Sequence, residues 1–227
     1  MDRKTLAQFL DLANHHSEST QNDVCHLCQK VDQFGFHAAF VNPCWVSLAK
    51  ESLKSEAKVG TVVAFPLGQE TQDVKILTSI KAIDQGADEL DISMNVGWFK
   101  SGQTDKVLGE MKAMVEAVRN LKKKTIVKFI IETGLLTDEE IKKASEMVLS
   151  SGADFIKTNS GMGPRGASLK DVELIKNVVG DKIKIKVAGG IDTLKKAIDF
   201  IQAGVSRIGT SKAVEIIKEL DDFNKSK

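Results

Sequence analysis

The sequence predicts an α/β fold in which eight parallel strands and eight helices form a single-domain (β/α)8 barrel, or TIM barrel. Short apolar segments alternate with longer amphipathic segments along the whole chain, a pattern typical of a parallel sheet covered by helices. Eight strands is the number that closes such a sheet, and 227 residues is close to a minimal barrel. No linker or low-complexity segment divides residues 1–227. The alternative is an open doubly wound sheet, which usually contains fewer units.

The expected strands are short runs rich in apolar and β-branched residues. In chain order they cover 8–13, 37–41, 58–64, 88–94, 125–131, 153–157, 183–187 and 206–209. Helical apolar periodicity fills the intervals, and these helices cover 19–33, 45–55, 71–85, 104–122, 138–151, 169–179, 193–203 and 212–219. Thr104 and Thr137 are capping residues at two helix starts, and Gly86, Gly152 and Gly204 end helices ahead of the next strand.

Side-chain alternation within the later strands predicts which charged residues point into the barrel. Residues i and i+2 share one face of a strand, and the face under the helices should be apolar. The polar series therefore points inward, and near the strand ends it consists of Asp91, Lys128, Glu132, Lys157 and Lys186. Inward charges at the carboxyl ends of barrel strands indicate an active site. The alternative is a structural ion network that bridges the strands.

Two of these residues, Lys157 and Lys186, end neighbouring strands and lead into glycine-rich loops. Burying an ammonium group is costly, so a fold that does so needs a reason. Two cations close together lower the pKa of one of them, and the neutral amine that results attacks carbonyl groups. The pair therefore predicts Schiff-base chemistry, unless both are ordinary surface lysines.

The loops after the last two strands predict a phosphate site. Gly189 and Gly190 follow the seventh strand, and Gly209, Thr210 and Ser211 follow the eighth and lead into the last helix. In barrels these two loops commonly bind phosphate through glycine amides and a helix N-terminus. The expected ligand is a small phosphorylated molecule whose far end reaches the lysines.

Composition excludes several other classes of function. Lys plus Arg (32) nearly balances Asp plus Glu (31), so no overall field favours nucleic acid or an acidic membrane. We expect no membrane span and no signal peptide, because no long apolar run occurs. Three cysteines suit a reducing cytoplasm. Cys25, His26 and Cys28 suggest a metal site, but no second Cys/His pair completes four ligands, so no metal is expected.

With these residues identified, the chain resembles the deoxyribose-phosphate aldolases, class I aldolases of the (β/α)8 type. The resemblance runs from about residue 9 to 213. Its motifs are Val41-Asn-Pro43, residues 59–68, Gly86-Ala-Asp-Glu-Leu-Asp91, Asn95-Val-Gly97, residues 128–133, residues 152–158, Lys186-Val-Ala-Gly-Gly190 and Arg207-Ile-Gly-Thr-Ser211.

The resemblance implies reversible cleavage of 2-deoxy-D-ribose 5-phosphate to D-glyceraldehyde 3-phosphate and acetaldehyde, with no metal or other cofactor. It implies that Lys157 forms the Schiff base, that Lys186 lowers the pKa of Lys157, and that Asp91 moves protons with the help of water. Lys128 and Glu132 are expected to orient these groups. The absence of Tyr, and of a His at the carboxyl end of any predicted strand, also favours Asp91.

Several positions depart from the family pattern. The usual Asp-His-Thr-Leu-Leu type of first strand reads Asp11-Leu-Ala-Asn-His-His16 here, so only Asp11 is retained. Phe40 stands where the family has a small residue or cysteine. After the nucleophile Ser160 keeps a hydroxyl, whereas Met162 replaces an aromatic residue. These departures leave open an altered pocket.

Two other functions remain possible at this point. The chain could be a divergent barrel that binds a sugar phosphate without turnover, or a Schiff-base aldolase for a different phosphorylated substrate. Since matched site residues are more informative than fold alone, the deoxyribose-phosphate activity is favoured. A homodimer is expected only because two-fold assemblies are the commonest.

Overall fold

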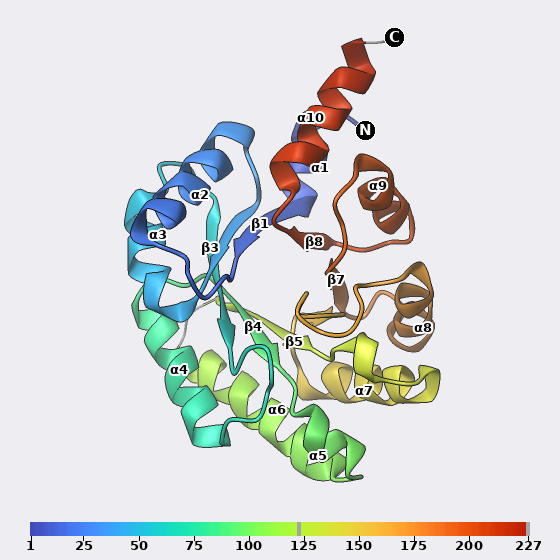
Figure 1. Cartoon of the computed structure of the whole chain (residues 1–227). Coiled ribbons are helices and arrows are strands. Elements are labelled where there is room, and N and C mark those ends of the chain that lie inside the picture. The colour runs from blue at the N-terminus through green and yellow to red at the C-terminus, as the bar shows by residue number, and fades with distance from the viewer. Residues whose placement is uncertain (122–123, 226–227) are drawn as a thin grey trace.

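A closed barrel of eight parallel strands forms the centre of the computed structural model, which describes residues 1–121 and 124–225 (Figure 1). Each strand pairs with its neighbours in sequence, and the first pairs with the last. The strands are β1 Leu10–Asn14, β2 Ala38–Val41, β3 Lys58–Val63, β4 Glu89–Ser93, β5 Ile126–Ile130, β6 Phe155–Lys157, β7 Lys184–Ala188 and β8 Arg207–Thr210. The predicted (β/α)8 architecture is confirmed, and the open-sheet alternative is wrong.

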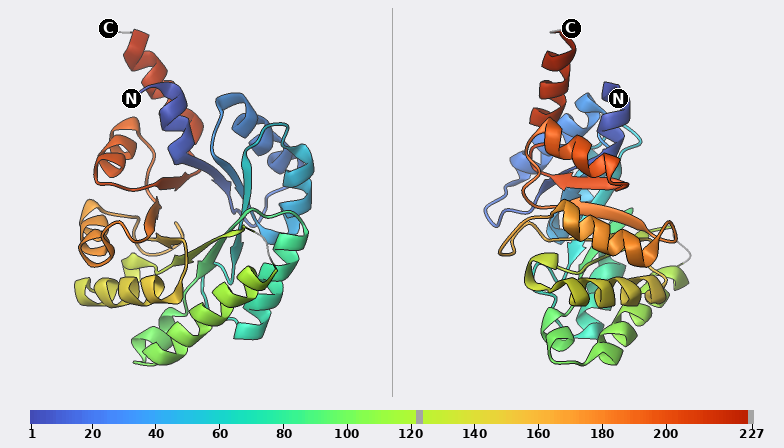
Figure 2. Two further views of the ribbon diagram at one scale, coloured as in Figure 1. Left: turned by 180° about the vertical axis from the view of Figure 1, so that it is seen from behind. Right: turned by 90° about the vertical axis from the view of Figure 1, so that its right-hand side faces the viewer.

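Helices surround the barrel on its outer side (Figures 1 and 2). They are α1 Arg3–Phe9, α2 Gln21–Phe34, α3 Val46–Ser52, α4 Gln72–Asp84, α5 Val96–Lys100, α6 Thr104–Asn120, α7 Asp138–Ser151, α8 Leu169–Val179, α9 Leu194–Gln202 and α10 Ala213–Lys225, with short 3-10 turns η1 Pro43–Trp45 and η2 Thr133–Leu135. None of these helices, in the part of the chain described, has the length and apolar character needed to cross a bilayer.

Local sequence explains most helix boundaries. Thr20, Thr137 and Ser168 each begin a helix with a reciprocal capping box, in which the side chain accepts a backbone N–H of the first turn. Gly35 and Gly152 end α2 and α7 in the left-handed conformation. The expected caps at Thr137 and Gly152 are therefore confirmed.

The structure differs from the predicted elements in several places. The last helix, predicted over 212–219, covers Ala213–Lys225, and Gln103 rather than Thr104 precedes α6. Helix α1, begun by the Asp2 side chain, takes up residues 8 and 9, so β1 covers 10–14 rather than the predicted 8–13. Helix α5 was also missed; Asn95 caps it immediately after β4. The predicted helix 104–122 ends at Asn120, and residue 122 lies outside the described residues.

The predicted inward and outward faces are confirmed within β4 and β5, but not for Glu132, which lies beyond the end of β5 with a left-handed backbone. Leu90, Ile92, Val127 and Phe129 are buried in the apolar layer between barrel and helices. Between them Asp91 and Lys128 pair side by side across β4 and β5 and point inward. A ring of charged side chains therefore lies inside a closed apolar wall.

Candidate active site

The lysines at the ends of β6 and β7 share one carboxylate. Lys157 Nζ lies 2.8 Å and Lys186 Nζ 3.0 Å from the same oxygen, Asp91 Oδ2. Lys128 Nζ lies 3.0 Å from Oδ1 of that residue. All four side chains are almost completely buried. The interpretation of Lys157 and Lys186 as ordinary surface lysines is therefore wrong.

The charged cluster continues from the carboxyl ends of the strands, where Lys157 and Lys186 lie, toward their amino ends. Lys186 pairs with Asp11 at 2.7 Å, which places the retained first-strand aspartate in the same cluster. Lys128 pairs with Glu89, the first residue of β4, and Glu89 lies 2.9 Å from His37 Nε2. This deeper part is a structural ion network of the kind the sequence left open, and it lies below the reactive end of Lys157.

Burial and neighbouring charges set the protonation of Lys157. Burial lowers the pKa of Lys157 most strongly; the carboxylate of Asp91 opposes this effect and the cation of Lys186 adds to it. The sequence-based argument named Lys186 as the cause, whereas the structure gives burial the larger share. An amine with a lowered pKa is available in its neutral, nucleophilic form.

The same arrangement keeps Asp91 ionised. Burial by itself raises the pKa of a carboxyl group, but the cations of Lys128, Lys157 and Lys186 together hold the pKa of Asp91 well below its usual range. Both of its oxygens are engaged by these lysines. Asp91 is therefore the carboxylate that all three lysines share.

Glu132 does not join the charged cluster. It has φ +54°, which takes it out of the strand alternation, and its Oε2 accepts the Ser160 backbone N–H at 3.0 Å. Its Oε1 accepts from Asn159 Nδ2 at 3.2 Å. Ser160 Oγ in turn accepts the Met162 N–H at 3.0 Å. Glu132 thus fixes the loop that follows Lys157 rather than its ammonium group.

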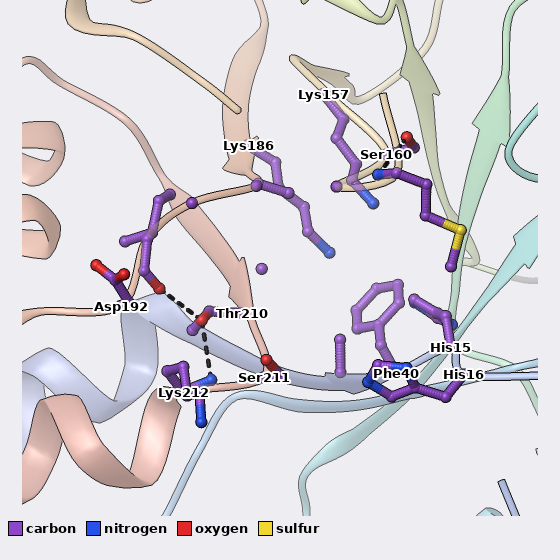
Figure 3. Close-up of a pocket in the computed structure, with 18 residues that line it drawn as sticks. His15, His16, Phe40, Lys157, Ser160, Lys186, Asp192, Thr210, Ser211 and Lys212 are labelled. Carbon is purple, nitrogen blue, oxygen red and sulfur yellow. Dashed lines mark hydrogen bonds between the residues drawn. The ribbon is translucent and has the colours of Figure 1, made fainter. Parts of the chain in front are cut away.

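A cavity of about 310 Å³ opens at the carboxyl ends of the strands (Figure 3). Lys157 and Lys186 reach it from one side, and both predicted phosphate loops line it. The lining residues from these loops include Gly189, Gly190, Gly209, Thr210 and Ser211. The two lysines and the two glycine-rich loops therefore border one space.

Backbone conformation in the β7–α9 loop requires glycine. Gly189 and Gly190 have φ of +89° and +73°, which L-residues with side chains rarely adopt. Gly166 lies against the Gly189 carbonyl so closely that a Cβ there would overlap it. Gly209 has a different role, because a Cβ at that position would come 3.1 Å from Cε of Lys186. Gly209 makes room for the lysine stem.

The hydroxyl of Thr210 is already used within the protein. Thr210 Oγ1 donates to the Ile191 carbonyl at 2.7 Å and accepts the Lys212 N–H at 2.9 Å (Figure 3). Its single proton is therefore not available to an anion. Thr210 holds the β7–α9 and β8–α10 loops together, and Ser211 remains the exposed hydroxyl beside them.

Phe40 occupies the barrel interior beside the cavity. Its ring centroid lies 3.4 Å from Lys186 Nζ and 4.8 Å from Lys128 Nζ, within the range of cation–π contacts. The ring also covers Gly60, where any Cβ would overlap it. The departure noted in the sequence thus fills space and contacts two of the cluster's cations.

Sequence reasoning missed His15. It follows β1, is half-buried and lines the cavity (Figure 3). Its ring centroid lies 5.2 Å from that of Phe65. His15 directly follows Asn14, the last residue of β1, whereas the predicted strand ended at residue 13, two positions before it. The His15-His16 pair in the departing first-strand motif was the available signal.

The cysteine–histidine segment on α2 shows no metal-binding arrangement. Cys28 is buried and donates to the Ala49 carbonyl at 3.7 Å, and burial raises the pKa of its thiol to about 12. Within residues 1–121 and 124–225, no three His, Cys, Asp or Glu side chains are grouped to hold a metal ion.

The family model and two of the most similar relatives describe the same kind of enzyme. A family model described as "DeoC/LacD family aldolase" matches residues 5–211. The chain is 43% identical over 222 residues to a deoxyribose-phosphate aldolase of Aciduliprofundum boonei, covering 97% of this chain and 99% of the relative. It is 44% identical over 220 residues to that of Caldicellulosiruptor saccharolyticus, covering 96% and 100%.

Two solved aldolase structures are also similar to this chain. An aldolase called QR15 superimposes with a TM-score of 0.91 at 38% identity, covering 99% of this chain and 97% of its own. A tetrameric deoxyribose phosphate aldolase from Aeropyrum pernix gives a TM-score of 0.88 at 25% identity, covering 98% and 93%.

Proposed function

This chain belongs to the DeoC/LacD aldolase family, and from that premise we propose that it cleaves 2-deoxy-D-ribose 5-phosphate reversibly to D-glyceraldehyde 3-phosphate and acetaldehyde through a Schiff base on Lys157. One observation carries the proposal: Lys157, whose pKa burial lowers, borders the same cavity as the Gly189–Gly190 and Thr210–Ser211 loops. The 5-phosphate would lie on these loops and C1 at Lys157.

The reaction follows from this placement. The neutral amine of Lys157 adds to C1 of the open-chain sugar, and loss of water gives an iminium ion. As the C3 hydroxyl gives up its proton to water, its O–H electrons form the new C3 carbonyl and the C2–C3 electrons pass to the iminium, which releases glyceraldehyde 3-phosphate and leaves an enamine. Protonation at C2 and hydrolysis then release acetaldehyde and restore the amine.

The other charged residues support this sequence. Lys186, paired with Asp11 and Asp91, lies beside Lys157 and lowers the pKa of its amine, which favours the neutral form. Asp91, hydrogen-bonded to Lys157 Nζ at 2.8 Å, moves protons with water at the carbinolamine. Lys128 and Glu132 orient Asp91 and the loop after Lys157, respectively.

Reductive trapping tests the proposal. Borohydride added with acetaldehyde should fix one two-carbon adduct on Lys157, located by peptide mass mapping. Lys157→Ala should abolish both the adduct and retro-aldol turnover in a coupled glyceraldehyde-phosphate assay. Lys184→Ala, at the exposed opposite end of β7, is the matched control and should retain both.

Other outcomes would point to the remaining candidates. Binding of deoxyribose 5-phosphate with neither adduct nor product would indicate a non-catalytic sugar-phosphate barrel. An adduct on Lys157 together with turnover of only another sugar phosphate would indicate a different aldol substrate. An adduct on another lysine would show that Lys157 is not the nucleophile.

Domain organisation, location in the cell and oligomeric state complete the proposal. The whole of residues 1–227 would act as one catalytic domain, and the free cysteines Cys25, Cys28 and Cys44 suit a cytoplasmic enzyme. A homodimer is proposed on the frequency of two-fold assemblies, and light scattering during gel filtration would test it.

A further inference from the structure

A second cavity, of about 660 Å³, lies at the amino ends of the barrel strands, away from the candidate active site at their carboxyl ends. Lys58, Lys184 and Arg207, the first residues of β3, β7 and β8, line it. His37, which directly precedes β2, lines it as well. A cavity of this size can hold a small molecule.

The side chains that line this amino-end cavity leave an excess of positive charge. Both acidic residues of the lining, Asp88 and Glu89, are already paired with lysines. In the part of the chain that the structure describes, Lys58 and Lys184 are exposed and form no ion pair. Together with Arg207 they would attract an anion into the cavity.

Arg207 and Glu89 compete for one nitrogen atom of His37. Nε2 of His37 lies 2.7 Å from Arg207 Nη2 and 2.9 Å from Glu89 Oε1. A ring nitrogen either carries a hydrogen and donates it or carries none and accepts one, so it cannot satisfy a guanidinium and a carboxylate together. Burial raises the pKa of Glu89, but the cation of Lys128 holds this pKa below its usual range, so Glu89 is ionised and has no hydrogen to donate. One of the two contacts of Nε2 therefore lacks its hydrogen bond.

The rest of the Arg207 guanidinium is also incompletely hydrogen-bonded. Nη1 donates to the backbone carbonyl groups of Ser206 at 3.0 Å and Gln8 at 3.4 Å. Nε is buried, has no hydrogen-bond partner among the described residues, and lies 3.8 Å from Asp11 Oδ1. A donor that the protein satisfies poorly gains from an added acceptor. Arg207 is therefore the lining residue with most to gain from a bound anion.

The order of the strands places the three cations on two sides of the cavity. Lys184 and Arg207 begin neighbouring strands, which lie about 4.8 Å apart, so both can reach one phosphate group. Strand β3, which Lys58 begins, is four strands away from β7 in the ring of eight and so lies across the barrel from it. A ligand with two anionic groups matches this arrangement better than a single anion.

We propose that the amino-end cavity binds a small anion with at least two phosphate groups, one held by Arg207 and Lys184 and the other by Lys58. Arginine matches the geometry of phosphate oxygens, and lysine adds a mobile point charge. An anion that accepts from Nη2 of Arg207 frees His37 to donate to Glu89, which removes the conflict at Nε2. The inference goes beyond the proposed function and does not depend on it, because it concerns the other end of the barrel.

The four histidines of the chain report separately on the two cavities. His15 and His16 line the cavity at the carboxyl ends, His37 lines the amino-end cavity, and His26 lines neither. In protein with isotope-labelled histidine, titration with pyrophosphate should shift the nitrogen NMR signals of His37 saturably and leave its Nε2 protonated, while His26 does not move. Shifts confined to His15 and His16 would place pyrophosphate at the candidate active site alone and would overturn the inference.

Charge variants measure the contribution of each side of the cavity. Lys58→Gln and Lys184→Gln, both at exposed positions, should each weaken the pyrophosphate affinity measured at His37 about tenfold. Lys112→Gln, on the exposed side of α6, is the matched control and should bind as wild type does. Inorganic phosphate should bind wild type about tenfold more weakly than pyrophosphate, because it reaches one side only.

The possible results are distinguishable. Equal pyrophosphate affinity in wild type, Lys58→Gln and Lys184→Gln would overturn the inference, and so would phosphate that binds as tightly as pyrophosphate. Borohydride trapping with acetaldehyde is measured on the same samples. A wild-type protein that shows the His37 shift but no adduct on Lys157 would refute the proposed function and leave this inference intact. Circular dichroism melting identifies any variant that does not fold.

Discussion

Three buried lysines share the carboxylate of Asp91, and they differ in the other partners that they have. Lys128 is held deep in the barrel by Glu89 as well, Lys186 is also held by Asp11, and Lys157 has Asp91 as its charged partner. Lys157 is therefore the member whose cation is least supported and whose pKa is lowered. The residue best suited to lose its proton is the one that reaches the cavity.

At the residue scale, Lys186→Met should move the pH dependence of the enzyme. Lys186 lowers the pKa of Lys157, so its removal raises that pKa and leaves more of the amine protonated at neutral pH. The acidic limb of kcat/KM should therefore shift to higher pH, and kcat/KM at pH 7 should fall about 10²-fold. Full pH–rate profiles of the coupled cleavage reaction measure both effects.

Lys184→Met is the matched control, because Lys184 lies on the same strand at its exposed end. Its profile should coincide with that of wild type. An acidic limb that stays in place in Lys186→Met would show that burial alone sets the state of Lys157.

At the scale of elements, the alternation of side chains along the strands predicted much of the site. The period of two placed Asp91, Lys128, Lys157 and Lys186 inside the barrel, because helices cover every strand and force one face to be apolar. The alternation does not hold at Glu132, because its left-handed backbone interrupts the two-residue period of the strand. It also did not point to His15, because the helix that Asp2 caps takes up residues 8 and 9 and β1 ends one residue later than predicted, at Asn14. Such changes depend on packing that a local pattern does not contain.

The two phosphate loops were predicted by position, but their internal hydrogen bonds were not. Thr210→Val would remove the bond to the Ile191 carbonyl and the acceptor for the Lys212 N–H. We expect KM for deoxyribose 5-phosphate to rise about tenfold, as lost hydrogen bonds of about 1 kcal/mol each loosen the site. Trapping of acetaldehyde should be unaffected, since acetaldehyde has no phosphate.

Thr78→Val on α4, away from both loops, serves as the comparison and should leave KM unchanged. Isothermal titration with inorganic phosphate would measure phosphate affinity without catalysis, and it should be weaker for Thr210→Val than for Thr78→Val and wild type. Equal KM values for Thr210→Val and wild type would mean that the loops keep their shape without this hydroxyl.

At the scale of the whole molecule, the interior charges couple folding to pH. Lys128 and the lysines around it hold the pKa values of Glu89 and Asp91 below their usual range, in spite of burial. A carboxyl group with a lowered pKa in the folded state adds stability above its unfolded pKa of about 4. That contribution is lost as the pH falls toward the folded-state value.

The free energy of unfolding should therefore decrease steeply below about pH 4, more than exposed ion pairs could explain. Urea denaturation at pH 7, 5 and 3 measures this dependence. Glu89→Gln should be less stable at pH 7 but show a smaller decrease between pH 5 and 3. Parallel pH curves for the two proteins would contradict the assignment to these carboxylates.

The contact of Phe40 with Gly60 restricts how the barrel interior can change. Any side chain at position 60 would collide with the ring, whereas a smaller residue at position 40 leaves room above the glycine. Laboratory selection for bulkier aldehydes would thus acquire a replacement of Phe40 first, and only afterwards a replacement of Gly60. In the reverse order, a side chain at position 60 would overlap the ring of Phe40. Replacements of Gly60 should therefore occur only in variants that have already lost Phe40.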